Sequence, residues 1–261
     1  MLPRRPLLQG SRDPSALEPL IAAAEEALRT WEPVWTAFLA PELREEAEAR
    51  LGGLSELSLA SLGGVAGAER RRLLLQRVEV AQEPGSLSAP LTGLEISGNF
   101  LFDPAEPADV RAGLLAAGAE EGEIGDVWLR GERGGQAVVD PALAARLDGT
   151  AARVRTVEVR LEARPLEELQ PPPARVARRI STVEASLRLD AVASAGFGVS
   201  RSRMAERIRE GGVRVNWQPV HNPSRELSVG ERVRLEGRGE LRIEEVNETK
   251  RGRWRIVMER T

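Results

Sequence analysis

The sequence predicts an α+β protein made of several small domains. The chain has 261 residues, and a domain usually holds roughly 100–200, so two or three compact units are expected. Apolar residues recur with helical spacing in some segments and alternate as strands do in others. Residues 175–261 carry 19 Lys and Arg against 12 Asp and Glu, a formal charge of +7, whereas residues 1–174 carry −10. The C-terminal third therefore differs from the rest in charge.

Residues 1–62 are predicted to be a helical N-terminal region. Apolar residues recur at helical spacing from Leu17 to Trp31, and Pro33 ends this first helix. Pro41 suits the first turn of a second helix. The pattern favours a helical packing unit without chemistry of its own.

Residues 63–169 are predicted to form a ferredoxin-like domain. RNA-recognition motifs have the same order of elements, and they stack bases on aromatic residues of the sheet. The candidate third strand, residues 136–139, has no aromatic side chain, so a scaffold or protein-contact role is favoured over base stacking. The elements that give this order are strands at 91–100, 124–129, 136–139 and 154–161, preceded by a strand at 73–80, and helices at 110–117 and 141–147.

Residues 170–182 are predicted to be a linker, because three prolines at 171–173 stiffen the chain. The arginines that follow, Arg175, Arg178 and Arg179, are either extra phosphate contacts or a solvated tether.

Residues 183–261 are predicted to contain two short helices, a strand and a closing hairpin. Leu189, Val192, Ala193 and Gly196 give the first helix a narrow apolar face. Ser200 can cap the second helix, whose inward face includes Met204 and Ile208. A strand at 213–215 follows, and strands at 240–246 and 253–258 form the hairpin, with basic residues in its turn.

Arginines crowd the first turns of the second helix. A helix N-terminus carries unpaired N–H groups and a partial positive charge, so cations there oppose the helix dipole. Arg201 and Arg203 occupy the first turn, and Arg207 shares the face of Arg203 one turn later. A bound phosphate would pair with both the N–H groups and the guanidinium forks. For an arbitrary helix these residues alone favour a solvated basic surface, and a phosphate site is the alternative.

The C-terminal motifs resemble the RNA-binding domain named after the fourth protein of the small ribosomal subunit, the S4 domain. The resemblance covers about residues 183–246 and rests on Arg188-Leu189-Asp190, Ser200-Arg201, Met204-Ala205 and the run from Gly211 to Asn216. It implies that the two-helix face and the following hairpin lie along structured RNA. The RNA-binding residues expected on this basis are Arg188, Ser200, Arg201, Arg203, Met204, Arg207, Arg214, Asn216, Trp217 and Gln218.

The order of motifs along the chain is similar to that of the bacterial YlmH-type RNA-binding proteins, whose cyanobacterial and plastid relatives are called photosystem II S4 domain proteins. The resemblance implies a part in translation or in the rescue of stalled large ribosomal subunits, and Arg70, Arg71, Arg72, Arg178 and Arg179 are expected as accessory RNA contacts. The motifs that carry it are Gly63-Gly64 followed by Ala68-Glu69-Arg70, Thr36-Ala37-Phe38-Leu39 and Ile124-Gly125-Asp126, together with residues 186–202.

The composition argues against several other classes of protein. Cysteine is absent and there is a single histidine, so disulfides, thiolate sites and histidine clusters for a metal are not expected. No apolar run approaches the roughly 20 residues of a membrane span, and no secretion signal begins the sequence. The expectation is a cytoplasmic protein without cofactor, metal or membrane contact.

An enzymatic role is not expected. Arg188-Leu189-Asp190 is similar to the catalytic Arg-Leu-Asp of pseudouridine synthases, but Leu187 precedes it in place of the usual Gly. No Gly-rich cofactor loop follows a strand, and no nucleophile elbow is present. Two functions remain open: a factor that docks on rRNA or tRNA at the ribosome, and an assembly factor, for example for photosynthetic complexes, with secondary RNA binding.

Overall fold

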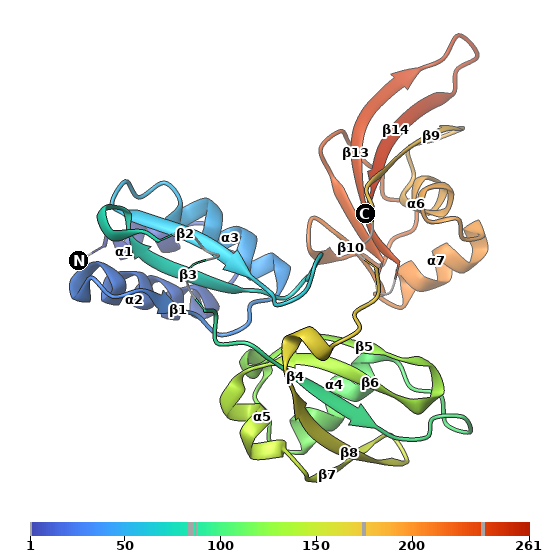
Figure 1. The fold of residues 1–261 in the computed structure, drawn as a ribbon. Helices are drawn as coiled ribbons and strands as arrows, with labels where there is room; N and C mark the ends of the chain where they lie inside the picture. The colour runs from blue at the N-terminus through green and yellow to red at the C-terminus, as the bar shows by residue number, and fades with distance from the viewer. Residues whose placement is uncertain (1, 83–85, 87, 174–175, 236–237) are drawn as a thin grey trace. The chain divides into compact units, whose positions relative to one another are not determined.

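The computed structural model describes residues 2–82, 86, 88–173, 176–235 and 238–261, and it divides the chain into two compact units. The first unit is Met1–Ala174 and the second is Arg175–Thr261. The first unit contains an N-terminal domain and a central domain, each with its own sheet (Figure 1). Each unit is described by itself.

The N-terminal domain packs helices against a three-stranded antiparallel sheet of order β1-β3-β2. Asp13 caps the longest helix by accepting a hydrogen bond from the backbone N–H of Ala16, and Leu17 and Ile21 of that helix share one core with Leu73 and Leu75 of β3. The elements are α1 (Arg4–Leu8), α2 (Pro14–Thr30), β1 (Val34–Trp35), α3 (Pro41–Leu51), β2 (Leu57–Leu62) and β3 (Arg72–Arg77).

Two sequence predictions for this part of the chain are therefore wrong. The region 1–62 is mixed rather than purely helical, and the strand predicted at 73–80 belongs to the N-terminal sheet rather than to the central domain. The strand is buried along nearly its whole length because it is the middle strand of three. Its apolar run identifies a buried strand but does not say which sheet it joins.

The central domain is ferredoxin-like, as predicted. Its sheet has the order β5-β6-β4-β8-β7, which is the strand order of that fold with β7 added at one edge. Residues of both helices share a core with one face of the sheet. The elements are β4 (Thr92–Ser97), α4 (Pro107–Ala116), β5 (Ile124–Leu129), β6 (Gly134–Val139), α5 (Pro141–Leu147), β7 (Ala151–Val154) and β8 (Val157–Arg164), with 3₁₀ turns at Glu121–Glu123, Gly131–Arg133 and Leu166–Glu168. A further 3₁₀ turn, Val78–Val80, follows β3 in the N-terminal domain.

The second unit is a six-stranded antiparallel sheet of order β11-β10-β12-β13-β14-β9 with two helices packed on one face. Gly196 allows the first helix to approach the sheet closely, since a Cβ atom there would lie 2.4 Å from Leu241 Cδ1. The hairpin of β13 and β14 extends beyond the helices (Figure 1). The elements are β9 (Arg178–Glu184), α6 (Leu189–Phe197), α7 (Arg201–Arg209), β10 (Val213–Val215), β11 (Gln218–Pro219), β12 (Arg232–Leu235), β13 (Gly239–Glu248) and β14 (Trp254–Arg260).

Part of the predicted linker is a strand of this sheet. β9 pairs antiparallel with β14, from Arg178 opposite Arg260 to Glu184 opposite Trp254. Polar residues alternate along it with half-buried Ile180 and Thr182, so its local sequence gives only a weak strand signal. Residues 174 and 175, and with them the predicted contact Arg175, lie outside the described residues.

Candidate nucleic-acid interface

The second helix of the C-terminal unit begins where the sequence predicts. The Ser200 hydroxyl accepts a hydrogen bond from the backbone N–H of Arg203 at 3.4 Å, which caps α7. The Arg203 and Arg207 side chains are exposed, and within the described part of the chain neither guanidinium makes a hydrogen bond or an ion pair. These two cations are therefore available to an anion at the start of the helix.

Arg201 has a different environment. The Asp190 side chain is 7% exposed, and its carboxylate accepts two hydrogen bonds from Arg188 at 3.0 Å and two from Arg201 at 3.2 Å. Burial by itself raises the pKa of Asp190, but the hydrogen bonds from the two guanidinium groups outweigh it and hold the pKa below its ordinary value. The acidic partner of Arg201 within the protein was not predicted from the sequence. Together the three side chains, here called the Asp190 clamp, tie α6 to α7.

The start of α6 is fixed by the loop that precedes β12. The backbone N–H groups of Leu189 and Asp190 donate to the carbonyl oxygens of Arg225 and Pro223, at 2.7 and 3.0 Å. Arg225 donates to Glu231 Oε1 at 2.7 Å. This loop therefore satisfies N–H groups that a helix start leaves without partners.

The tip of the β10–β11 hairpin is a two-residue turn formed by Asn216 and Trp217, with φ angles of 48° and 71°. Asn216 is a structural residue, because its side chain accepts from the N–H of Arg232 at 3.0 Å and donates to Glu231. The Trp217 ring lies 4.9 Å from the guanidinium carbon of Arg232 and 5.4 Å from that of Arg234. The hairpin tip thus joins an aromatic ring to two cations.

The predicted RNA-binding residues fall into two groups around this sheet. Arg188, Ser200, Arg201, Arg203 and Arg207 gather at the start of the two helices, and Arg214, Asn216, Trp217 and Gln218 lie on the hairpin. Met204 belongs to neither group, because its side chain is fully buried in the core between the helices and the sheet. The prediction of Met204 as an RNA contact is therefore wrong, and its inward helical face was the signal against it.

Three arginines on the outer face of the sheet, Arg232, Arg234 and Arg242, were missed as candidates. Val233 and Leu235 point into the core, so Arg232 and Arg234 point to the opposite face. Arg214 pairs in register with Arg234, and Arg242 pairs in register with Arg232. The alternation of Arg and apolar residues along β12 was the sequence signal for this face.

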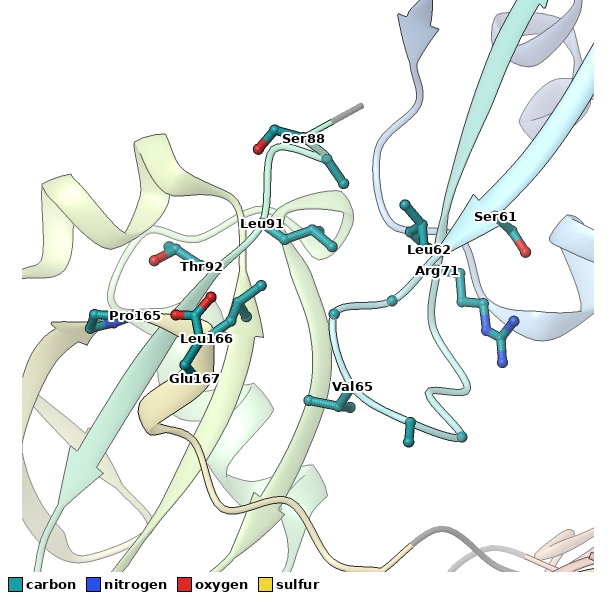
Figure 2. A pocket seen from close by; sticks show the side chains of 15 residues that line it. Ser61, Leu62, Val65, Arg71, Ser88, Leu91, Thr92, Pro165, Leu166 and Glu167 are labelled. Atoms are coloured by element: carbon teal, nitrogen blue, oxygen red, sulfur yellow. The ribbon is translucent and has the colours of Figure 1, made fainter. Parts of the chain in front are cut away.

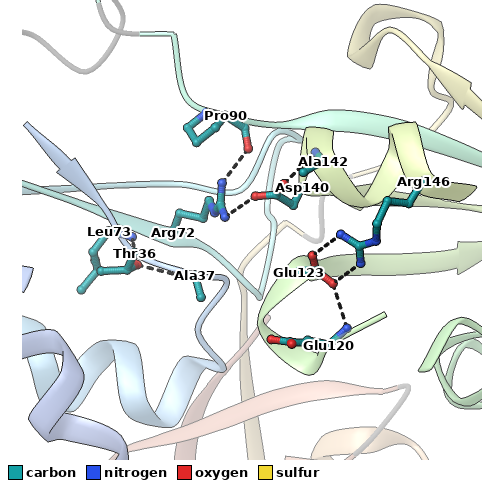
Figure 3. Close-up of polar contacts among 10 residues, drawn as sticks. All are labelled: Thr36, Ala37, Arg72, Leu73, Pro90, Glu120, Glu123, Asp140, Ala142 and Arg146. Atoms are coloured by element: carbon teal, nitrogen blue, oxygen red, sulfur yellow. Dashed lines mark hydrogen bonds and ion pairs between the residues drawn. The ribbon is translucent and has the colours of Figure 1, made fainter. Parts of the chain in front are cut away.

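The accessory candidates Arg70 and Arg72 are engaged inside the first unit. The Arg72 side chain is 9% exposed, and it donates to Asp140 at 2.6 Å and to the Pro90 carbonyl oxygen at 2.8 Å (Figure 3). The Arg70 side chain donates to the carbonyl oxygens of Ile124 and Glu121. Both residues join the N-terminal domain to the central domain, and their part as RNA contacts stays a prediction.

The motif residues around them meet at the same junction. The Asp126 carboxylate accepts the backbone N–H groups of Glu69 and Arg70, at 2.7 and 2.9 Å. Burial raises the pKa of Asp126, and these two hydrogen bonds oppose that effect. The third accessory candidate in this segment, Arg71, remains half-buried, and its Nε donates to the Ala68 carbonyl oxygen.

A cavity of about 750 Å³ lies beside this junction (Figure 2). Its walls are the end of β2, the loop 63–67, and Leu91 and Leu166 of the central domain. Val65, Leu91 and Leu166 pack against a small apolar cluster that includes Phe38 and Trp128. The arrangement explains why the loop and the Phe38 motif occur together: both build the junction between the two domains.

The remaining accessory candidates lie on β9. Arg179 donates to Glu244 at 2.9 Å and to Glu245 at 2.6 Å, and exposed Arg178 begins the strand.

Across the described ranges, no group of three or more His, Cys, Asp or Glu side chains is placed to hold a metal ion. Among these same residues, no helix has both the length and the apolar character needed to cross a membrane.

Two segments of the chain match known protein families. Residues 13–80 match the family described as YlmH, N-terminal, and residues 187–233 match the S4 domain. The chain is 27% identical over 209 residues to the ribosome-associated protein quality control protein P2 of Bacillus subtilis. The alignment covers 80% of each of the two chains. A solved structure, the cell division protein ylmH from Streptococcus pneumoniae, aligns with 64% of this chain and 94% of its own, at 20% identity and a TM-score of 0.47.

Proposed function

Because the chain combines the N-terminal domain of YlmH-type proteins with an S4 RNA-binding domain, we propose that it is a non-enzymatic RNA-binding factor of the ribosome. It docks residues 175–261 on structured RNA, either rRNA or tRNA held on a ribosomal subunit, and acts in translation or ribosome-associated quality control in the cytoplasm. The observation that carries the proposal is the exposed pair Arg203 and Arg207 at the capped start of α7, within a unit of formal charge +7. The Bacillus subtilis relative is a ribosome-associated quality control protein, which supports the ribosomal setting.

The geometry favours phosphate binding at the start of α7. The Ser200 hydroxyl accepts the hydrogen bond of the Arg203 N–H. The N–H groups that precede it in the first turn of the helix can then donate to an anion. Arg203 and Arg207 supply guanidinium forks beside these groups. The Asp190 clamp holds Arg188 and Arg201 in fixed orientations, so less side-chain freedom is lost when RNA binds.

Binding without chemistry is the second part of the proposal. General acid–base catalysis needs a side chain that is free to exchange a proton with the substrate. Asp190 is committed to two guanidinium groups, and His221 Nδ1 lies 3.1 Å from the carbonyl oxygen of Arg209 at the end of α7. Both arrangements suit structural roles.

The test compares charge-matched double variants for co-sedimentation with purified ribosomal subunits. We expect Arg203→Ala with Arg207→Ala to release the protein from the subunits at a lower salt concentration than wild type. Each phosphate contact that is lost lowers the slope of log K against log salt by about 0.7–0.9. The control is Arg133→Ala with Arg153→Ala, which removes two exposed arginines of the central domain.

Wild-type protein that does not sediment with subunits at low salt would contradict the ribosomal role. Equal release of the two double variants would contradict the assignment of binding to α7. Mass spectrometry of total RNA incubated with the protein, with and without S-adenosylmethionine, tests the absence of chemistry. A new modified base that is lost in Asp190→Ala would overturn that part.

A further inference from the structure

Trp217 has a backbone conformation that its side chain disfavours. It is the second residue of a two-residue hairpin turn, with φ at 71°, and the preceding Asn216 has φ at 48°. Turns of this geometry favour Asn followed by Gly, because both positions have positive φ. A bulky aromatic residue in this region is an outlier, and such outliers gather at ligand contacts. The ring therefore needs an explanation beyond the turn itself.

Arginines surround the ring on the outer face of the sheet. Arg232 and Arg234 lie within cation–π distance of the ring, and both project from β12 away from the core. Arg214 pairs in register with Arg234, and exposed Arg242 pairs in register with Arg232. Glu240 pairs with Arg232 at 2.6 Å and offsets part of this charge. The tip thus combines an aromatic ring with a row of cations.

We propose that Trp217 is the stacking platform for one unpaired RNA base, and that the neighbouring Arg214, Arg234 and Arg242 bind the phosphates on either side of that nucleotide. The inference rests on the proposed function, which it deepens by naming the class of RNA. Aromatic rings and guanidinium planes stack on bases that are splayed out of a helix. Bases inside an A-form duplex are already stacked, so the partner is a folded RNA with a bulged or looped-out nucleotide.

A purely structural role for Trp217 makes the opposite prediction for stability. If the contacts with Arg232 and Arg234 were the reason for the tryptophan, its replacement by glycine would destabilise the unit. If the ring serves RNA, glycine relieves the disfavoured φ and the unit becomes as stable as wild type or more so. The two explanations are therefore separated by one melting curve.

The experiment measures fluorescence anisotropy with three labelled RNA hairpins of equal length: one fully paired, one with a single bulged adenosine, and one with an abasic site in the bulge. The last two carry the same phosphate charge. We expect full-length wild type to bind the bulged adenosine about five- to 150-fold more tightly than the abasic hairpin. Trp217→Gly loses this preference and keeps the salt dependence of binding, because no charge is removed. Trp217→Phe retains part of the preference.

Equal wild-type affinity for the bulged and abasic hairpins would overturn the inference. A Trp217→Gly protein with a lower melting temperature and unchanged preference would also overturn it. If Trp217→Gly does not fold, Trp217→Asn replaces it, since Asn also tolerates positive φ. Trp217→Gly that keeps the RNA preference but no longer sediments with subunits would identify a protein contact instead. If the stacking proposal fails in one of these ways, weaker binding of all three hairpins by Arg203→Ala would still support the proposed function. If wild type binds none of the hairpins, both the stacking proposal and the proposed function are rejected.

Discussion

At the scale of single residues, Asp190 determines how the candidate RNA-binding arginines are presented. Its carboxylate holds Arg188 and Arg201 at the same time, one from the residue before α6 and the other from the first turn of α7. Arg203 makes no such contact within the described residues. In the first turn of α7, Arg201 therefore has a structural role, whereas the Arg203 side chain is left for a ligand.

Asp190→Asn is expected to destabilise the second unit by roughly 1–3 kcal/mol near neutral pH, because two charge-assisted pairs are lost. The pKa of Asp190 in the folded protein lies below its ordinary value, so the ionised form is favoured by folding. Its contribution is complete above about pH 4, the ordinary pKa range, and is lost as the pH falls through the lower folded-state pKa. Urea unfolding of both proteins at a series of pH values measures the difference. A gap that widens toward acid pH would contradict this assignment.

Arg201→Ala and Arg203→Ala are expected to separate stability from binding. Arg201→Ala removes a partner of buried Asp190 and costs about 0.5–1 kcal/mol of stability, measured as a lower melting temperature. Arg203→Ala leaves stability unchanged or slightly raised, since a cation is removed from a helix N-terminus. Both variants weaken RNA binding. Arg201→Lys is the control, because it keeps the charge and loses the fork.

At the scale of elements, the loop between β2 and β3 joins two domains of the first unit. Gly63 has no space for a side chain, since a Cβ atom there would lie 2.3 Å from Ala68 Cβ and 2.9 Å from the Arg70 carbonyl oxygen. The N–H of Arg70 is in turn bound by Asp126. The glycine therefore lets the loop reach the central domain.

Gly63→Ala is expected to destabilise the first unit by about 1–3 kcal/mol, because the added methyl group meets backbone that cannot move freely. Gly53→Ala is the matched control, with nothing within 4 Å of its Cβ position. Calorimetry of both variants measures the effect. RNA affinity is expected to stay at the wild-type value in both, and a fall only in Gly63→Ala would assign the loop a direct part in binding.

The sequence predicted those elements whose signals are local. The cap at Ser200, the helix Pro141–Leu147 and the strand Ile124–Leu129 follow from spacing, turn residues and proline within a few positions, and the structure has them where predicted. β9 was missed because its partner β14 lies far along the chain and its own residues are mostly polar. The same limit hid the Asp190 clamp, since Asp190 and Arg201 stand on different helices. The internal partners of Arg70 and Arg72, which are Asp140 and backbone carbonyl oxygens, were not predicted because a run of arginines in sequence does not reveal what it contacts.

At the scale of the whole molecule, the charge is divided between the two units. We expect a fragment of residues 176–261 to bind structured RNA with a strong salt dependence, since positive charge is concentrated there and the unit has its own core. A fragment of residues 1–173 has an excess of acidic residues and is expected to bind at least tenfold more weakly in the same assay, by roughly 1.4 kcal/mol or more. Filter binding at several salt concentrations measures both. Comparable binding by the N-terminal fragment would move the interface to the first unit.

The pairing of β9 with β14 bears on when the second unit can complete its fold during synthesis. β9 is made early in the second unit, yet its register partners run from Trp254 to Arg260. A nascent chain that ends before these residues lacks the strand between β13 and β9, and the sheet under α6 and α7 stays incomplete. Domains fold as units during translation, and contacts distant in sequence form slowly. We therefore expect a chain whose translation stops short of this strand to have no complete sheet beneath α6 and α7.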